Sequence, residues 1–253
     1  MKVVHVVPGS GGTFYCQNCL RDSSLVPALR NLGLDVILVP LYLPILTDEA
    51  APESDAPVFF GAVNVYLQQK LSLFRKTPRW LDRLLDADGL LSLIARKAAS
   101  TRAEGLENMT LSMLRGEEGR QAKELDRLVR WLKADVRPDI VHLSNALLVG
   151  LARRMKEELG CSVVCSLQDE DDWVEAMRPG FVERVWKEMA QRAMDVDVFT
   201  SASSYYAEKM RNALNLPAEK LRVVHLGIPT DAYVSAPQPV SYTHLTLPTK
   251  RIV

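Results

Sequence analysis

Short apolar runs alternate with amphipathic stretches along most of the chain. The apolar runs at Lys2–Val7 and Asp35–Pro40 are typical of strands that are buried on both faces of a sheet. Between them we expect a glycine turn and then a helix over Cys16–Leu32, which Pro27 should kink or shift and Gly33 should end. A strand, a helix and a second strand at this spacing predict a parallel sheet with a right-handed crossover.

The same alternation returns in the second half of the chain. Apolar runs predict four more strands there, at Asp139–Leu143, Ser162–Leu167, Val196–Ser201 and Leu221–His225. Periodic stretches between them predict helices at Ala146–Leu159, Phe181–Ala193 and Ser203–Leu214. The region before them predicts almost only helix and includes an apolar stripe within Gly119–Val136. We therefore expect an α/β fold with a doubly wound, mainly parallel, Rossmann-like sheet and a helical insertion around residues 62–136.

Composition and charge narrow the class of protein. Hydrophobic residues make up 47% and charged residues 25% of the 253 residues, as in ordinary globular proteins. The 31 Lys and Arg residues balance the 31 Asp and Glu residues, so we expect no nucleic-acid partner. The first apolar run is too short for a secretion signal, and no apolar run reaches the length of a membrane span. We therefore expect a cytoplasmic protein.

The glycine-rich turn at residues 8–12 is the first candidate binding element. Glycines after a strand let backbone N–H groups approach a phosphate, so Gly11 and Gly12 are candidate ligand contacts. A tight turn without a ligand is the alternative. A dinucleotide site is not expected, because Phe14 stands where its third glycine would fall and no acid follows the strand Asp35–Pro40.

Polar residues that follow two later strands are the next candidates. His142 ends one strand, and it either contacts a ligand or is satisfied in the core. Gln168 and Asp169 follow the strand Ser162–Leu167 at the same edge of the sheet. The acidic run at residues 169–172 could hold a sugar hydroxyl, act as a base or bind a metal, or it could cap the next helix.

Two further features have simple structural interpretations. Cys16 and Cys19 form a CxxC pair at a helix start, where the pKa of a thiol is lowered. The pair could be redox-active, or it could be half of a zinc site together with Cys161 and Cys165. The spacing of Cys161 and Cys165 suits a metal poorly, so we expect packing residues and no metal site. Basic and apolar residues alternate over residues 70–83, which predicts either peripheral contact with the inner membrane face or a solvated helix.

Three motifs in order resemble those of the family 4 glycosyltransferases, which have the GT-B fold. Residues 8–12 read P-x-x-G-G, and residues 28–36 resemble the family's "AL…GHEV" with Leu34 in place of histidine. Residues 138–142 resemble its "PD-hydrophobic-hydrophobic-H" strand. Residues 223–231 resemble its closing "NG-[IV]-D" segment, with Leu226 in place of asparagine. The resemblance covers about residues 1–233.

The resemblance implies a retaining glycosyltransferase that moves a sugar from a nucleotide-sugar donor to a sugar or lipid acceptor, without a further cofactor. It implies that residues 1–236 form the N-terminal, acceptor-side domain and that a separate C-terminal lobe binds the donor. We therefore expect the chain to be inactive alone. The alternative is a self-contained nucleotide- or anion-binding α/β module.

The resemblance also implies a set of substrate-binding residues in the cleft between the two lobes. They are Gly11, Gly12, His142, Gln168, Asp169 and Gly227. No catalytic residue is assigned, because many members carry a histidine where Gln168 stands. After Val234 the periodicity ends and prolines punctuate the chain, so we expect residues 237–253 to be a non-native or disordered tail.

Overall fold

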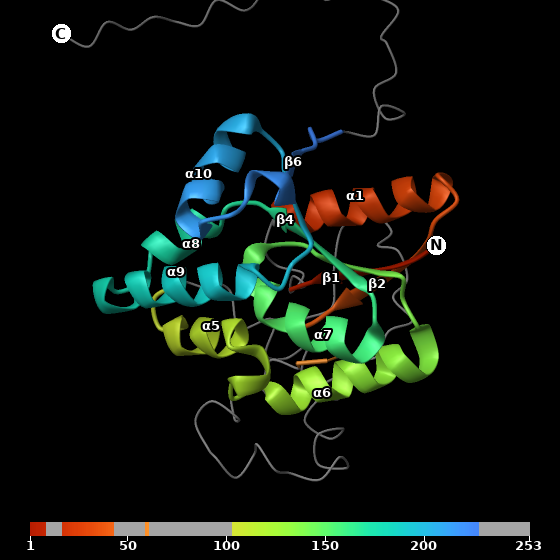
Figure 1. The fold of residues 1–253 in the computed structure, drawn as a ribbon, viewed down its shortest axis with the longest axis horizontal. Coiled ribbons are helices and arrows are strands. Elements are labelled where there is room, and N and C mark those ends of the chain that lie inside the picture. The colour runs from red at the N-terminus through yellow and green to blue at the C-terminus, as the bar shows by residue number, and fades with distance from the viewer. Residues whose placement is uncertain (9–16, 43–58, 61–102, 228–253) are drawn as a thin grey trace, which may run out of the picture.

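A computed structural model describes residues 1–8, 17–42, 59–60 and 103–227 (Figure 1). Some of the sequence predictions lie outside these ranges and stay predictions. They concern Gly11, Gly12, Cys16, residues 62–102 of the helical insertion with its basic stretch at 70–83, and the tail at 237–253.

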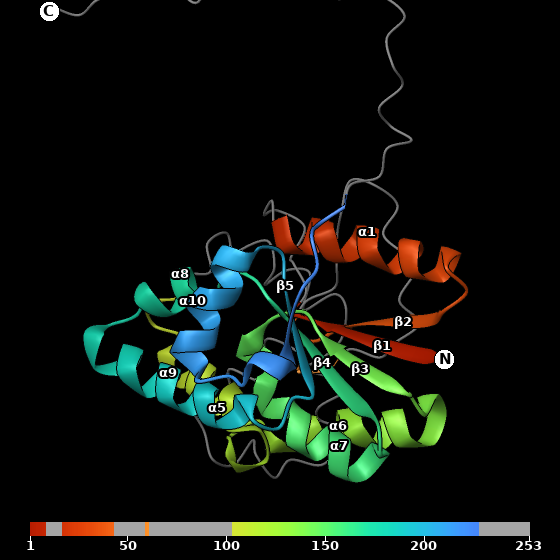
Figure 2. The ribbon, with the colours of Figure 1, turned by 45° about the horizontal axis from the view of Figure 1, so that its top comes forward.

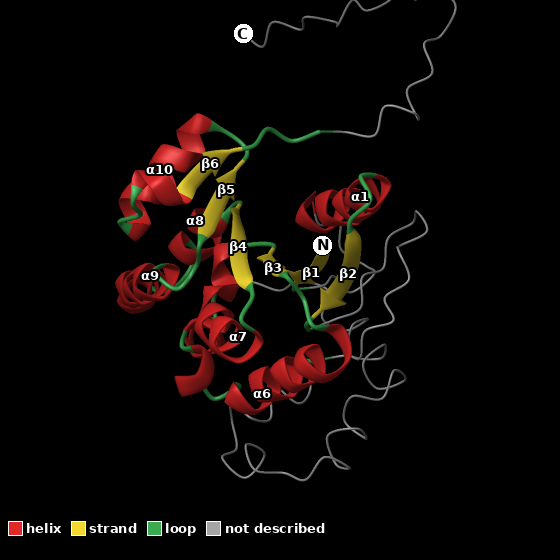
Figure 3. Ribbon diagram, turned by 45° about the vertical axis from the view of Figure 1, so that its right-hand side comes forward, coloured by secondary structure: helices red, strands yellow, loops and turns green. Residues whose placement is uncertain are grey.

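One sheet of six parallel strands forms the centre of the fold, in the order β2-β1-β3-β4-β5-β6 (Figure 3). Its strands are β1 (Lys2–Val7), β2 (Asp35–Pro40), β3 (Ile140–Leu143), β4 (Ser162–Leu167), β5 (Val198–Ser201) and β6 (Leu221–Val223). The order reverses at β1, which pairs with β2 on one side and with β3 on the other. The crevice between the carboxyl ends of β1 and β3 is therefore the place where doubly wound sheets bind ligands.

Helices cover the two faces of this sheet unequally. The described helices are α1 (Gln17–Asn31), α5 (Glu107–Leu114), α6 (Ala122–Trp131), α7 (Ala152–Leu159), α8 (Glu170–Glu175), α9 (Pro179–Ala193) and α10 (Ser204–Leu214). Helix α1 lies on one side of the sheet, while α5, α6, α7 and α9 lie on the other (Figure 2). This arrangement confirms the predicted doubly wound, Rossmann-like α/β fold, and the described part of the insertion is helical.

The first βαβ unit follows the sequence pattern closely. Helix α1 continues through Pro27, and Gly33 ends it with a φ of +83°. The N–H group of Leu34 donates a hydrogen bond to the carbonyl of Leu29 at 3.2 Å, as expected for a helix that ends in a left-handed glycine. Helix α1 buries Val26 against Val3 and other apolar residues of β1 and β2.

The opposite face of the sheet carries the main apolar core. Val4 and Val6 of β1 and Phe199 of β5 are fully buried there, together with apolar side chains of the helices below. Among the described residues, no helix is both long enough and apolar enough to span a bilayer.

Candidate functional site

Polar groups gather where β3 and β4 end, next to the reversal in strand order. The N–H group of Ser144, directly after β3, donates to the carbonyl of Val6 in β1 at 3.0 Å. The side-chain amide of Gln168, directly after β4, donates to the carbonyl of Ser144. Two side-chain oxygens here, Oγ of Ser144 and Oε1 of Gln168, are buried and have no hydrogen-bond partner among the described residues. The site therefore presents unused polar atoms beside a fixed backbone.

A buried carboxylate holds these strand ends together. Oε1 of Glu170 accepts a hydrogen bond from the N–H group of Ala146 at 2.7 Å. Oε2 accepts from the N–H group of Gln168 at 2.8 Å and from the hydroxyl of Tyr206 at 2.9 Å. Burial raises the pKa of Glu170, and these hydrogen bonds oppose that rise. Because protein donors occupy both oxygens, Glu170 joins the turns after β3 and β4 to α10.

The acidic run therefore divides into residues with different surroundings. Oδ1 of Asp171 lies 2.7 Å from the hydroxyl of Tyr206, whose single proton Glu170 and Asp171 share, and Asp171 pairs with Lys209, so it also contacts α10. Asp169 precedes α8 and is exposed, and its side chain makes no capping hydrogen bond to that helix. Glu170, Asp171 and Asp172 lie in the first turn of α8, where negative charge is favoured, and Asp169 stays the candidate for ligand contact.

A row of polar side chains crosses the sheet on the side of α1. His5 of β1 is in register with His142 of β3, and their ring centroids lie 4.6 Å apart. Nε2 of His142 lies 2.8 Å from Oγ of Ser166 in β4. Oγ1 of Thr200 in β5 lies 3.0 Å from the same serine oxygen. The row thus runs from β1 to β5 without a break.

Helix α1 adds two charged side chains to this row. Oδ1 of Asp22 lies 3.2 Å from Nε2 of His5, and both side chains are buried. The NH2 group of Arg21 donates to Oγ of Ser166 at 3.0 Å. Burial lowers the pKa of His142 well below 6.5, and electrostatic repulsion by His5 and Arg21 lowers it further. The imidazole of His142 is therefore neutral at pH 7.

The segment after β6 passes the same edge of the sheet. The N–H group of Val224 donates to the carbonyl of Ser201 at 2.8 Å, and Nδ1 of His225 lies 3.0 Å from the carbonyl of Ala202. Gly227, two residues further on, is exposed. The end of the described chain thus runs beside the end of β5.

The structure brings three predicted residues, His142, Gln168 and Asp169, to one edge of the sheet. Gly11 and Gly12 lie outside the described residues. The polar row with Arg21 and Ser166 was not predicted, although Ser162 and Ser166 of β4 are four residues apart and so share one face of the strand.

Cys161 and Cys165 take no part in this site. Cys161 and Cys165 are buried, and burial raises the pKa of both thiols. Within the part of the chain that the structure covers, no group of His, Cys, Asp and Glu side chains is arranged to hold a metal ion.

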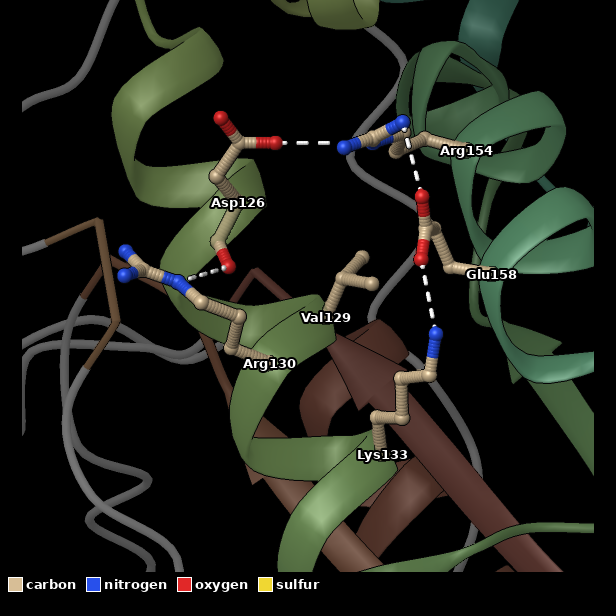
Figure 4. A pocket seen from close by; sticks show the side chains of 6 residues that line it. All are labelled: Asp126, Val129, Arg130, Lys133, Arg154 and Glu158. Carbon is tan, nitrogen blue, oxygen red and sulfur yellow. Dashed lines mark hydrogen bonds and ion pairs between the residues drawn. The ribbon is translucent and has the colours of Figure 1, made fainter.

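A shallow depression of about 310 Å³ lies elsewhere, between α6 and α7 (Figure 4). Its charged side chains pair with one another: Asp126 with Arg154 at 3.4 Å, and Glu158 with Arg154 and Lys133 at 3.0 Å each. Arg130 donates to the main-chain carbonyl of Asp126 at 3.0 Å. Such mutual ion pairs leave little charge for a ligand, so the depression is not the candidate site.

Known glycosyltransferases are similar to this chain in sequence or in structure. Residues 93–232, more than half of the chain, match the sequence profile of Glycosyltransferase Family 4. The solved structure of the lipopolysaccharide outer core galactosyltransferase WaaB in its apo form is similar, with a TM-score of 0.49 and 14% identity. That match covers 89% of this chain and 45% of WaaB, so the chain spans less than half the length of that protein. No curated protein matches the chain.

Proposed function

The chain belongs to glycosyltransferase family 4, and from that premise we propose that it takes part in moving a sugar from a nucleotide-sugar donor to a sugar or lipid acceptor. We propose retention of the anomeric configuration and no cofactor besides the donor. The family membership favours this function over that of a self-contained nucleotide-binding module.

The observation that carries the proposal is the unused polar edge beside the reversal of strand order. Oε1 of Gln168 and Oγ of Ser144 have no partner among the described residues. An amide oxygen and a hydroxyl suit sugar hydroxyls, which both donate and accept hydrogen bonds. The backbone around them is fixed by Glu170, so the edge is preorganised for a ligand.

In this proposal the domain over residues 1–236 shapes the acceptor side of the reaction. His142, Gln168, Asp169 and Gly227 line the acceptor site, while Gly11 and Gly12 approach the donor phosphates. A second lobe supplies the remaining donor contacts, so these 253 residues alone bind sugars weakly and do not turn over. The protein works in the cytoplasm, with peripheral membrane contact through residues 70–83 where the acceptor is a lipid.

An NMR titration of the ¹⁵N-labelled chain with uridine and guanosine diphosphate sugars and with simple glycosides tests the proposal. We expect saturable shifts at the amides of Ser144, Gln168 and Asp169, and no donor consumption in a parallel assay. Gln168→Ala should abolish the glycoside shifts. The matched control is Gln191→Ala, an exposed position on α9, which should keep them.

Each outcome of this experiment has a defined meaning. Absence of any shift at the strand ends with every sugar species would contradict the proposed function. Efficient sugar transfer by the 253 residues would support transferase activity but contradict the need for a second lobe.

A further inference from the structure

Arg21 is a cation whose partner in the structure is neutral. It lies in the first half of α1, and its side chain is half-buried. Its NH2 group donates to the hydroxyl oxygen of Ser166 at 3.0 Å. No carboxylate in the described ranges lies within ion-pair distance of this guanidinium, and Oδ1 of the neighbouring Asp22 lies 3.2 Å from Nε2 of His5 instead. A charge that is partly removed from water gains free energy from an anionic partner.

The hydroxyl of Ser166 orients the guanidinium without neutralising it. A serine oxygen has two lone pairs and one proton. The oxygen of Ser166 accepts a hydrogen bond from Arg21. It also lies 2.8 Å from Nε2 of His142 and 3.0 Å from Oγ1 of Thr200. The neutral imidazole adds no negative charge. The guanidinium thus keeps its full charge, and Ser166 is the acceptor that the described residues offer it.

A second, independent feature at this place points to a ligand. Ser144 is 1% exposed, yet its hydroxyl has no partner among the described residues. The register of β3 and β4 pairs His142 with Val164, so Ser144 and Ser166 come next to each other two residues further on. Because alternate residues share a face, both serines lie on the side of the sheet that α1 covers. A buried hydroxyl donor thus lies beside the guanidinium.

A guanidinium and hydroxyl donors are the groups that proteins use for phosphate. We propose that the guanidinium of Arg21, oriented by Ser166, and the hydroxyl of Ser144 form a binding site for a phosphate group, and that this group belongs to the acceptor. The site therefore selects a phosphorylated acceptor, such as a sugar phosphate. The assignment to the acceptor rests on the proposed function.

Ser166, which orients Arg21, is set apart from the donor phosphates of the proposed function. Those phosphates approach the turn after β1, whereas Ser166 lies in β4, and β3 lies between the two strands. Neighbouring strands are about 4.8 Å apart, so the distance is about 10 Å. Ser144, whose N–H group donates to the carbonyl of Val6 in β1 at 3.0 Å, is the part of the site nearest that turn, so the comparison of hexose phosphate with uridine diphosphate tests which phosphate the site binds.

Titrations followed by NMR at the amides of Ser144, Ser166 and Gln168 test this site. The probes are inorganic phosphate, a hexose 6-phosphate, the unphosphorylated hexose and uridine diphosphate, each at constant ionic strength. We expect the hexose phosphate to bind at least about tenfold more tightly than the hexose, because a hydrogen bond to a charged group is worth that much. Uridine diphosphate should bind here more weakly than the hexose phosphate.

Variants separate the charge of Arg21 from its contribution to folding. Arg21→Gln should weaken the binding of hexose phosphate about tenfold or more, and Arg21→Lys should recover part of it. The matched control is Arg30→Gln on the same helix, where the guanidinium donates to the carbonyl of Val36. This control should leave phosphate binding unchanged. Thermal melting of each variant shows that it is folded.

The outcomes distinguish this inference from the proposed function. Equal phosphate affinity in Arg21→Gln and wild type, or no phosphate binding at all, would overturn the site. Tighter binding of uridine diphosphate than of hexose phosphate, lost in Arg21→Gln, would overturn the assignment to the acceptor. Phosphate binding that depends on Arg21, in a protein whose Gln168 amide never responds to sugars, would leave the site standing while the proposed function fails.

Discussion

Nε2 of His142 lies 2.8 Å from Oγ of Ser166 on the neighbouring strand. The NH2 group of Arg21 donates to this oxygen, and the hydroxyl of Thr200 is within hydrogen-bond distance of it. If both act as donors, the lone pairs of Ser166 are filled and its proton points to His142. Nε2 of the neutral imidazole then accepts, and the proton of the ring is on Nδ1. In this arrangement the polar row determines the tautomer of His142.

We expect His142 to stay neutral well below pH 6.5, with the proton on Nδ1. Its folded-state pKa is lowered by burial and by repulsion from His5 and Arg21, so the unfolded chain binds this proton more readily. The stability that His142 contributes is present above pH 6.5 and is lost as the pH falls below that value. Proton–nitrogen correlation spectra of the imidazole report both the tautomer and the titration.

His142→Gln should make the stability less sensitive to pH between about 6.5 and 5, since glutamine keeps an acceptor for Ser166 but binds no proton. The comparison is the free energy of unfolding by urea for both proteins at several pH values. An imidazole that titrates at or above pH 6.5, or an unchanged pH dependence in the variant, would contradict this prediction.

Glu170→Gln should destabilise the domain by roughly 1–3 kcal/mol, because an amide cannot accept all three hydrogen bonds that the carboxylate receives. Urea unfolding monitored by circular dichroism measures the loss. Tyr206→Phe removes one of the three donors and should destabilise the domain less than Glu170→Gln does. The control is Asp172→Asn, which is exposed on the same helix and should change stability by less than about 0.5 kcal/mol. Equal stability of Glu170→Gln and Asp172→Asn would show that the buried carboxylate does not hold the strand ends.

The strand pattern of the sheet could be predicted from the sequence, because buried parallel strands are continuous apolar runs. The predicted and observed bounds agree for Lys2–Val7, Asp35–Pro40 and Ser162–Leu167. The predicted last strand was too long, since His225 leaves the ladder and contacts the carbonyl of Ala202. Helix α8 was missed because its six residues are too few to show an amphipathic period.

The candidate site could be predicted only in part. His142 lies near the end of one apolar run, and Gln168 directly follows another. Their place at the carboxyl edge therefore follows from the topology of parallel strands. Arg21 could not be predicted, since its contact with Ser166 spans 145 positions in sequence and depends on how α1 lies across the sheet. The role of Glu170 could not be predicted either. The sequence does not distinguish four consecutive acids, and only the fold shows that Glu170 is the buried one.

Gly150→Ala should be strongly destabilising. A Cβ atom at this position would lie 2.1 Å from the carbonyl oxygen of Met113 and 2.4 Å from that of Leu114. Both are backbone atoms at the end of α5, so the helix itself would have to move, at a cost of about 2–4 kcal/mol. Denaturant unfolding of the variant measures this cost.

The matched control is Gly180→Ala, in the first turn of α9, where a Cβ atom would meet nothing within 4 Å. Alanine has the higher helix propensity, so this variant should equal the wild type or exceed it by up to about 1 kcal/mol. A Gly150→Ala protein as stable as Gly180→Ala would contradict the close approach between α5 and the turn before α7.

Glu107→Gln should destabilise the domain by about 1–3 kcal/mol at neutral pH and progressively less in acid. The carboxylate is buried and receives Nε and NH2 of Arg178 at 2.7 and 3.2 Å, together with the N–H group of Gly105 at 3.0 Å. The hydrogen bond from Arg178 lowers the pKa of Glu107 from 4.5 to about 2.

Because the folded-state pKa of Glu107 is the lower one, the stability it contributes is present above pH 4.5 and is lost as the pH falls towards about 2. The difference in unfolding free energy between wild type and Glu107→Gln should therefore shrink across that window, as measured by urea titrations at pH 7, 4 and 3. Glu183→Gln, at an exposed position on α9, controls for the substitution itself and should have little effect at neutral pH. A Glu107→Gln deficit that stays constant from pH 7 to pH 3 would show that the ion pair with Arg178 does not stabilise the fold through its charge.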